Sequence, residues 1–113
     1  MHELSIALGI VKIAEQEIAK SEKKKVDVIE LELGTLAGIE FDALEFVWPM
    51  AVEKTILEKS QKKIEIVKAK AKCMDCDTVF NLDFIYDACP NCNSHLKAIL
   101  QGKELRVKAL QVS

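Results

Sequence analysis

Four cysteines close together in the second half of the chain constrain its fold more than any other feature. They are arranged as Cys73-x-x-Cys76 and Cys89-Pro90-x-Cys92, with twelve residues between the pairs, and the chain has no other cysteine. Each CxxC turn directs two sulfur atoms to one point, so two turns supply four thiolates, which suits tetrahedral Zn²⁺ with Zn–S bonds of about 2.3 Å. The spacing predicts a structural metal site with zinc as the first choice. Iron, which accepts the same ligands, and redox or disulfide chemistry stay open as alternatives.

The composition is typical of a small protein that keeps its thiols reduced. The 113 residues are 50% hydrophobic, enough for one domain with a small appendage. The formal net charge of −2 disfavours nucleic-acid binding, which needs a basic surface. No apolar run reaches the roughly 18–20 residues that span a membrane, and the start lacks the basic segment of a secretory signal. We therefore expect a cytoplasmic location, where cysteines bind metals rather than form disulfides.

The rest of the chain predicts two helices and three strands. Helical spacing of apolar residues covers 3–20, and a second helix is expected to begin near Glu40 to Asp42. Strands are predicted over 26–33, 64–72 and 105–112; in the first, apolar residues alternate with Glu30 and Glu32. This order predicts an α+β fold, a small three-stranded mixed sheet covered by two helices, with an inserted zinc-ribbon-like module. The expected domains are residues 1–72 plus 103–113, and the inserted module of residues 73–102.

Three details of these elements can be compared with a structure. The first helix carries two apolar stripes, which predict a helix lying well into the core: Leu4, Leu8, Val11 and Ile18, and then Ile6, Ile10 and Ile13. Pro49 lies inside the second helix, next to the expected core residue Trp48, and predicts a kink or two shorter helices because it removes a backbone hydrogen bond. The apolar face of the second strand switches at Ile66–Val67, which predicts a bulge or the point where the strand leaves the sheet.

The amino terminus is a second candidate metal site. The α-amine of Met1, the His2 imidazole and the amide between them can chelate one ion, and the amide or carboxylate of Glu3 could complete the shell. Nitrogen-rich, tetragonal coordination favours Ni²⁺ or Cu²⁺ over Zn²⁺. The other histidine, His95, follows Cys92 by three residues and could replace or tune a thiolate. On spacing alone, a plain surface histidine stays an open alternative for both.

Three motifs together resemble one known family. Met1-His2-Glu3-Leu4-Ser5 at the start, Leu33-Gly34-Thr35-Leu36 before the second helix, and the two cysteine pairs are similar to the HypA/HybF family of hydrogenase nickel-incorporation proteins. The resemblance covers essentially the whole chain, in matching order and length. It implies a nickel metallochaperone for the maturation of [NiFe]-hydrogenase, with urease also served in some members. The Pro49 position is not one where we expect a proline in this family.

The resemblance also implies ligands and partners. In the family the four cysteines hold a structural zinc, and they match Cys73, Cys76, Cys89 and Cys92. The nickel cargo is bound at the amino terminus, which matches Met1, His2 and Glu3. In some members an acidic residue that opens the second helix is also implicated, and it matches Glu40. The implied partners are a nickel-handling GTPase, the hydrogenase large subunit and, for some members, a urease accessory protein. The net charge and the lack of a long apolar run predict no nucleic-acid partner and no membrane.

Two other classes of function compete with this interpretation. CxxC pairs also occur in zinc-ribbon modules that bind nucleic acids or protein partners, although the acidic balance disfavours the former. A catalytic zinc keeps an open coordination position, and four thiolates leave none. The chain also lacks a glycine-rich phosphate loop and a Cys/His or Ser/His nucleophile arrangement. The prediction is therefore that the protein is not an enzyme.

Overall fold

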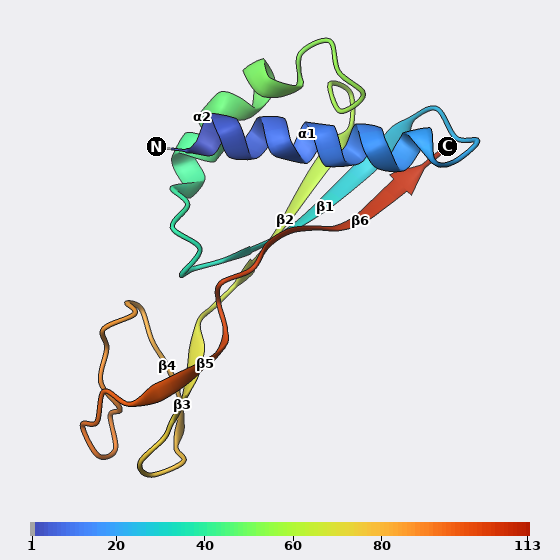
Figure 1. Ribbon diagram of the computed structural model, residues 1–113. Helices are drawn as coiled ribbons and strands as arrows, with labels where there is room; N and C mark the ends of the chain where they lie inside the picture. The colour runs from blue at the N-terminus through green and yellow to red at the C-terminus, as the bar shows by residue number, and fades with distance from the viewer. Residues whose placement is uncertain (1) are drawn as a thin grey trace. The chain divides into compact units, whose positions relative to one another are not determined.

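The computed structural model describes residues 2–113 and contains two helices and six strands in that range (Figure 1). Expectations that rest on Met1 lie outside the described residues. The chain divides into two compact units, which we call the helical unit (Met1–Leu31, Ile39–Glu65 and Arg106–Ser113) and the cysteine unit (Glu32–Gly38 and Ile66–Leu105). The elements follow one another as α1 (Glu3–Ala19), β1 (Val26–Gly34), α2 (Phe41–Val52), β2 (Gln61–Val67), β3 (Lys70–Cys73), β4 (Val79–Asn81), β5 (Lys97–Gln101) and β6 (Leu105–Val112).

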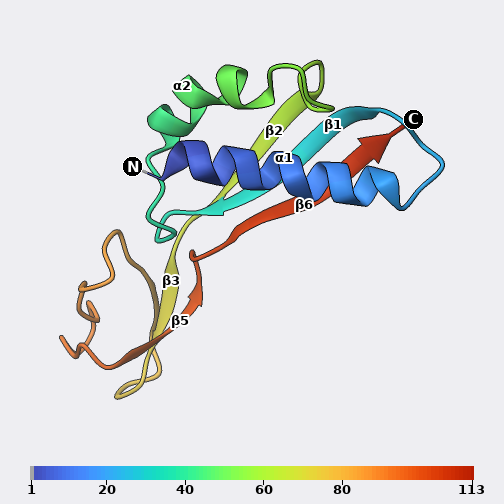
Figure 2. The ribbon, with the colours of Figure 1, turned by 45° about the horizontal axis from the view of Figure 1, so that its top comes forward.

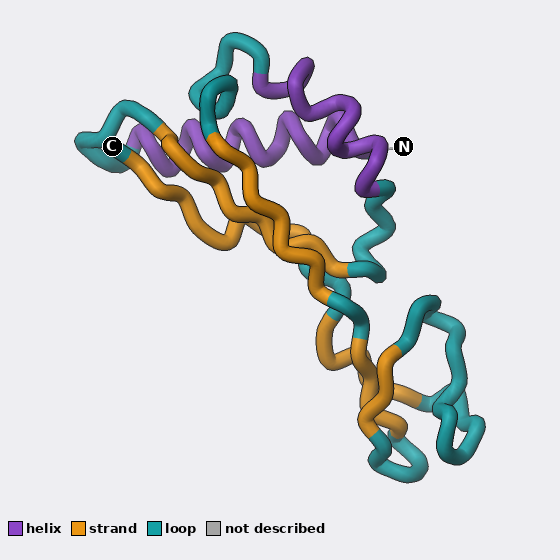
Figure 3. The backbone as a smooth tube through the Cα atoms, turned by 180° about the vertical axis from the view of Figure 1, so that it is seen from behind, coloured by secondary structure: helices purple, strands orange, loops and turns teal. Residues whose placement is uncertain are grey.

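The first sheet has the strand order β2-β1-β6, so β1 is the central strand. At one end of the β1–β6 pair, Lys25 and Ser113 each donate a backbone N–H to the other's carbonyl, and at the other end the N–H of Gly34 donates to the carbonyl of Glu104. Residue numbers rise along one strand as they fall along the other, so the pair is antiparallel. Both helices lie on one side of this sheet, as Figure 3 shows from behind.

On its other side, β1 runs parallel to β2. Near the start of β1, the Ser60 hydroxyl donates to the carbonyl of Val26, and near its end the N–H of Thr35 donates to the carbonyl of Val67. Residue numbers therefore rise together along both strands. One antiparallel and one parallel neighbour make the sheet mixed, which confirms the predicted fold class of a three-stranded mixed sheet with two helices.

The central strand builds the core as its alternation predicted. Ile29, Leu31 and Leu33 are fully buried, and Trp48 of α2 is 7% exposed. The Nζ atom of Lys62, on β2, lies 5.0 Å from the centre of the Trp48 ring, a cation–π contact. The expected acidic face is not open along its whole length, because Glu32 is buried as well.

Less of helix α1 is buried than its two apolar stripes predicted. Its buried residues are Glu3, Ala7, Ile10, Val11 and Ala14. By contrast Leu4, Leu8 and Ile13 are 39%, 50% and 44% exposed. The alanines, which are fully buried, let the helix backbone approach its neighbours closely, so the larger side chains on either flank stay at the rim of the contact. The prediction of buried stripes is therefore wrong for those three residues.

Helix α2 runs without interruption from Phe41 to Val52 with Pro49 inside it. The prediction of two shorter helices is wrong. Pro49 lies in the last turn of α2, so only three helical residues follow it. The backbone hydrogen bond that its missing N–H removes therefore does not divide the helix. In the part of the chain that the structure describes, neither helix is long and apolar enough to cross a membrane.

The cysteine unit has its own antiparallel sheet, β4-β3-β5, which the sequence did not predict; Figure 2 shows β3 beside β5. β2 ends at Val67 and β3 begins at Lys70 in this second sheet, so the switch of apolar face marks the exit of the chain from the first sheet. The register between β3 and β5 also shifts between Lys70 and Ala71. Six buried residues of the unit form a small core cluster: Ala69, Ala71, Cys73, Phe80, Leu82 and Cys89.

Candidate metal centre

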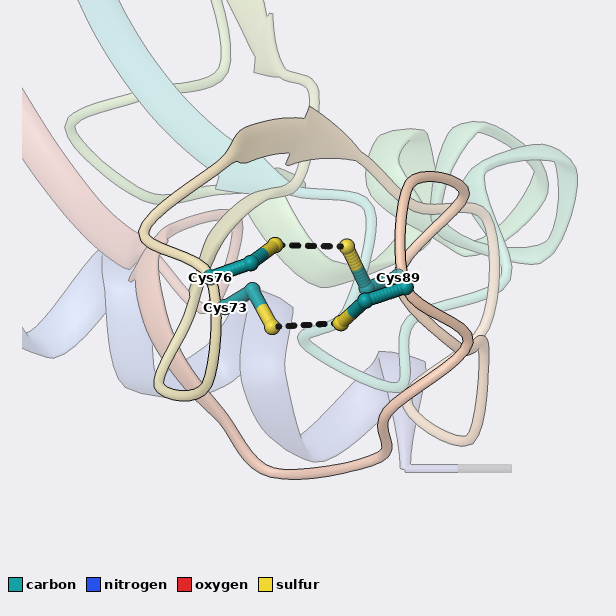
Figure 4. Close-up of side chains that lie close together, drawn as sticks. Cys73, Cys76 and Cys89 are labelled. Carbon is teal, nitrogen blue, oxygen red and sulfur yellow. Dashed lines mark hydrogen bonds between the residues drawn. The ribbon is translucent and has the colours of Figure 1, made fainter.

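The two cysteine pairs converge on one point in the cysteine unit. All four sulfur atoms lie within 4.8 Å of one another. The Sγ of Cys73 is 3.5 Å from that of Cys92, and the Sγ of Cys76 is 3.6 Å from that of Cys89. A tetrahedron with Zn–S bonds of about 2.3 Å has S···S edges of about 3.8 Å, so the cluster is close to that size. Figure 4 shows Cys73 and Cys76 on one turn facing Cys89 on the other.

The two cysteine pairs lie on two loops that have the same backbone conformation. In the first loop the N–H of Cys73 donates to the carbonyl of Thr78, and in the second the N–H of Cys89 donates to the carbonyl of Ser94, both at 2.8 Å. The residue after each second cysteine has a left-handed backbone, with φ of 63° at Asp77 and 65° at Asn93. Asp and Asn adopt this conformation more readily than other non-glycine residues. The sequence therefore repeats the loop chemistry as well as the CxxC spacing.

The electrostatics of the cluster favour a bound cation. Hydrogen bonding from the Asn91 amide, and then from Thr78, lowers the pKa of Cys76 to about 6. The backbone N–H of Ser94 favours the thiolate of Cys92, but the neighbouring Cys73 sulfur and burial outweigh it and raise the pKa of Cys92 to about 12. Sulfurs this close repel one another as thiolates. A divalent cation removes that repulsion and lets all four ionise.

Polar side chains that the sequence did not single out support this centre. The Nδ2 of Asn91 donates to the Sγ of Cys76 at 3.5 Å, and the Thr78 hydroxyl lies 3.2 Å from the same sulfur. The Ser94 hydroxyl donates to the Asp75 carboxylate, which joins the second cysteine loop to the first. The sequence could have indicated these four residues, because each lies within two positions of a cysteine. Which of their side chains point toward a sulfur depends on the loop conformation, which the sequence does not show. Such supporting contacts orient metal ligands.

The Leu33–Leu36 motif contacts the core of the same unit. Leu36 packs against the buried cluster of the cysteine unit, and its N–H donates to the carbonyl of Gly102 at 2.7 Å. The hydroxyl of Thr35 accepts from the N–H of Ala69. A Cβ on Gly34 would lie 2.0 Å from the Gly102 oxygen, so no other residue fits there. The motif therefore packs on the core of the cysteine unit.

The amino-terminal candidates lie at the start of the helical unit. His2 is exposed and directly precedes α1, and its carbonyl accepts from the N–H of Ile6. Glu3 is 4% exposed, and its Oε2 accepts from the backbone N–H of Glu40 at 3.3 Å. The structure thus brings Glu3 and the start of α2 together. His95 is exposed, and the metal-binding cluster that the described residues form comprises the four cysteines without it.

The fold and the cluster define a class of protein, a small α+β metal-binding protein with a four-cysteine site of zinc dimensions. A family model described as hydrogenase/urease nickel incorporation, metallochaperone, HypA matches residues 1–112. The chain belongs to this HypA family. The resemblance drawn from the three sequence motifs is therefore confirmed.

Relatives cover nearly the full length of the chain. It is 39% identical over 112 residues to the hydrogenase maturation factor HypA of Parabacteroides distasonis, covering 99% of this chain and 97% of the relative. It is 43% identical to HypA of a Roseiflexus species, covering 98% of this chain and 91% of the relative. Two solution structures share its fold: the nickel metallochaperone HypA of Helicobacter pylori, with a TM-score of 0.69 at 23% identity over 99% of this chain and 97% of that one, and a second HypA structure, with a TM-score of 0.70 at 24% identity over 100% and 97%.

Family membership confirms several predictions at the level of the family. The HypA family consists of nickel metallochaperones of hydrogenase maturation, and the four-cysteine cluster fits the structural zinc. Nickel as cargo and zinc as structural ion were both predicted. The family description is that of a metal carrier and not of a catalyst.

Proposed function

We propose that this chain binds Ni²⁺ at its amino terminus and delivers it for the maturation of [NiFe]-hydrogenase. The proposed nickel ligands are Met1, His2 and Glu3, with Glu40 as a further acidic group. Zinc, held by Cys73, Cys76, Cys89 and Cys92, stabilises the cysteine unit. Urease is a second client in this proposal, because the family description names both enzymes. The nickel-binding domain is residues 1–72 plus 103–113, and the zinc-binding module is residues 73–102.

The observation that carries the nickel proposal is the bond between the Glu3 carboxylate and the Glu40 backbone. Glu40 is the residue that precedes α2, and Glu3 is the first residue of α1. The bond of 3.3 Å therefore fastens the start of one helix to the start of the other. The contact joins residues 37 positions apart, and the exposed His2 directly precedes Glu3 in the sequence. Because the Glu3 carboxylate is engaged with a backbone N–H, its first role in this proposal is to position Glu40.

The two proposed sites suit different tasks. An exposed chelate at a chain terminus can exchange its metal quickly and pass it on. A closed site of four thiolates holds its ion as part of the fold, and its binding energy contributes to folding. The exposure of His2 and the burial of Cys73 and Cys89 support this assignment of cargo site and structural site.

The proposed partners are a nickel-handling GTPase, the hydrogenase large subunit and a urease accessory protein. Support comes from exposed apolar side chains on the helical unit. Phe46 and Met50, one turn apart on α2, are 83% and 60% exposed, and Leu4 and Leu8 of α1 are also at the surface. Exposed apolar patches are typical of protein contacts. A cytoplasmic location fits the four free thiols, because a reducing compartment keeps cysteines available for metal.

Calorimetric titration with Ni²⁺ tests the nickel site. The protein needs its native amino terminus, and three forms are compared: wild type, His2→Ala, and a form extended by residues before Met1. We expect one nickel per wild-type chain, loss of that binding in both changed forms, and a zinc content that stays constant in all three.

A variant at Glu40 separates the ligand from the fold. Glu40→Gln keeps the backbone N–H that donates to the Glu3 carboxylate. The substitution should therefore weaken nickel binding without changing the contact between the two helix starts. Nickel binding that survives both His2→Ala and the extension would show that the terminal chelate is wrong. The search would then move to the cysteines and His95.

A further inference from the structure

The cysteine unit exposes three consecutive large apolar side chains that the metal chemistry does not use. They belong to the segment of residues 82–88, which we call the aromatic loop. Phe84 is 56% exposed, Ile85 50% and Tyr86 67%. Large side chains left in water together are a common mark of a protein contact site.

Hydrogen bonds within the loop, most of them to the Asp87 side chain, hold it in one shape. The Asp87 carboxylate accepts from the N–H of Asp83 at 2.9 Å and from the N–H of Phe84 at 3.1 Å. The N–H of Asp87 donates in turn to the Phe84 carbonyl at 3.0 Å. Leu82 before the turn and Cys89 after it are buried, so both ends are anchored. A loop already ordered in the free protein loses little conformational entropy when it binds.

The two rings act as one surface. The centroids of Phe84 and Tyr86 are 5.2 Å apart, and the ring planes differ by only 4°. Tyr86 adds a hydroxyl that can hydrogen-bond at the edge of a contact. Rigid aromatic side chains of this kind dominate the binding energy of many protein interfaces.

The charge around the loop identifies the kind of partner. Residues 74–96 contain four aspartates, Asp75, Asp77, Asp83 and Asp87, and no lysine or arginine. Asp77 has a cation nearby, Lys72 Nζ at 3.8 Å, whereas the Asp83 side chain stands directly beside the exposed rings in the sequence. An acidic rim repels nucleic acid and anionic lipid, and it attracts a protein surface with lysine or arginine.

We propose that the aromatic loop docks into an apolar cleft, bordered by lysine or arginine side chains, on a protein of the hydrogenase maturation machinery. Phe84 and Tyr86 enter the cleft, and Asp83 pairs with its basic rim. The choice of partner rests on the proposed function, but the docking surface itself is defined by the cysteine unit alone. Neither the nickel ligands nor the zinc ligands belong to this surface.

The test measures binding of the zinc-loaded, full-length chain to two purified proteins, the hydrogenase large-subunit precursor and the maturation GTPase. The double variant Phe84→Ser/Tyr86→Ser should weaken binding to one of them by at least about thirtyfold. Asp83→Asn should weaken it less and reduce its dependence on salt, because a rim charge acts mainly on association. Leu100→Ser is the matched control, since Leu100 is 54% exposed on β5 of the same unit and should leave binding unchanged.

Any one of three binding results would overturn the docking proposal. They are wild-type affinity in the double variant, equal loss of binding in the Leu100→Ser control, and a wild-type chain that binds neither protein. A dimer of the wild type that the double variant dissociates would assign the loop to self-association and also reject the proposal. Ile85→Ser, which changes one exposed side chain of the same loop, serves as a second variant. Its zinc content verifies that it folds. Nickel calorimetry on the same variants should match the wild type, so failure of the nickel site and failure of the docking site are separately visible.

Discussion

Removal of zinc should unfold the cysteine unit and leave the helical unit folded. The core cluster of the cysteine unit buries only two large apolar side chains, Phe80 and Leu82. Their burial contributes about 5 kcal/mol at roughly 2–3 kcal/mol each. Ordering only ten residues of backbone costs about 10–20 kcal/mol. A structural zinc with four thiolates contributes on the order of 10–16 kcal/mol, so the metal is the larger stabilising contribution.

The helical unit does not depend on that ion in the same way. Its core contains several fully buried large side chains, among them Ile29, Leu31, Leu44 and Leu57, and Trp48 lies with them. A chelator in excess at neutral pH removes the zinc. The fluorescence of Trp48, the one tryptophan of the chain, should then stay close to that of the native protein. In an amide proton–nitrogen NMR spectrum, peaks from residues of β3, β4 and β5 should collapse to random-coil positions while those of α1 and α2 stay dispersed.

Cys89→Ala should reproduce the effect of the chelator, because it removes a buried ligand. The reasoning is refuted if the β3–β5 amides keep their native positions after zinc has left in stoichiometric amount. Loss of the α1 and α2 peaks at the same time would refute it as well, because it would show that the helical core depends on the metal. Restored spectra on adding zinc back confirm that the change was reversible.

Three further substitutions have defined outcomes. Gly102→Ala should lower the free energy of unfolding by about 2–5 kcal/mol in a denaturant titration, because φ is +116° and the new Cβ would lie 2.6 Å from the Cα of Ala69. Gly9→Ala should raise it by about 0.5–1 kcal/mol, because the position is inside α1 and nothing lies within 4 Å of the new methyl. Asn91→Ala should lower zinc affinity about tenfold in a chelator competition, because Cys76 loses its amide donor.

Matched comparisons make these outcomes decisive. The two glycine variants add the same methyl group, so equal effects of both would contradict the contact argument at Gly102. For zinc affinity the control is Asn81→Ala, which removes an exposed amide on β4 away from the cysteines in the sequence. An Asn91→Ala protein that competes for zinc as well as the control would show that the amide does not support the thiolate.

The features that the sequence predicted are those encoded by neighbours along the chain. The alternation in β1 correctly placed Ile29, Leu31 and Leu33 in the core, and the sequence placed both ends of α1 and the start of α2 within one or two residues. The cysteine cluster was predictable for the same reason, because a CxxC turn fixes two ligands locally. The exposed flanks of α1 were not, because the period shows that a helix has an apolar face but not how much of that face its neighbours cover.

The second sheet escaped prediction because its strands are short. β4 has three residues, too few for a period of two to be distinguished from chance, and β3 overlaps the predicted strand of residues 64–72, which the structure divides between two sheets. Their pairing depends on the cysteine loops that bring Lys72 opposite Val79. A strand defined by a metal-organised turn has no independent signal in its own residues.

The Leu33–Leu36 motif shows most clearly what resemblance can identify and what only the structure explains. As a sequence it marked the family without a physical reason. In the structure, Gly34 leaves room for the Gly102 carbonyl, Thr35 accepts from Ala69, and Leu36 packs on the cysteine-unit core. The motif therefore belongs to the cysteine unit, although it follows a strand whose larger part lies in the helical unit. Glu40 comes four residues after Leu36 and is bonded to Glu3 within the helical unit, so one short loop contains residues of both units. Because these contacts join residues more than 30 positions apart, no local pattern encodes them, and only the structure shows what the residues of the motif contact.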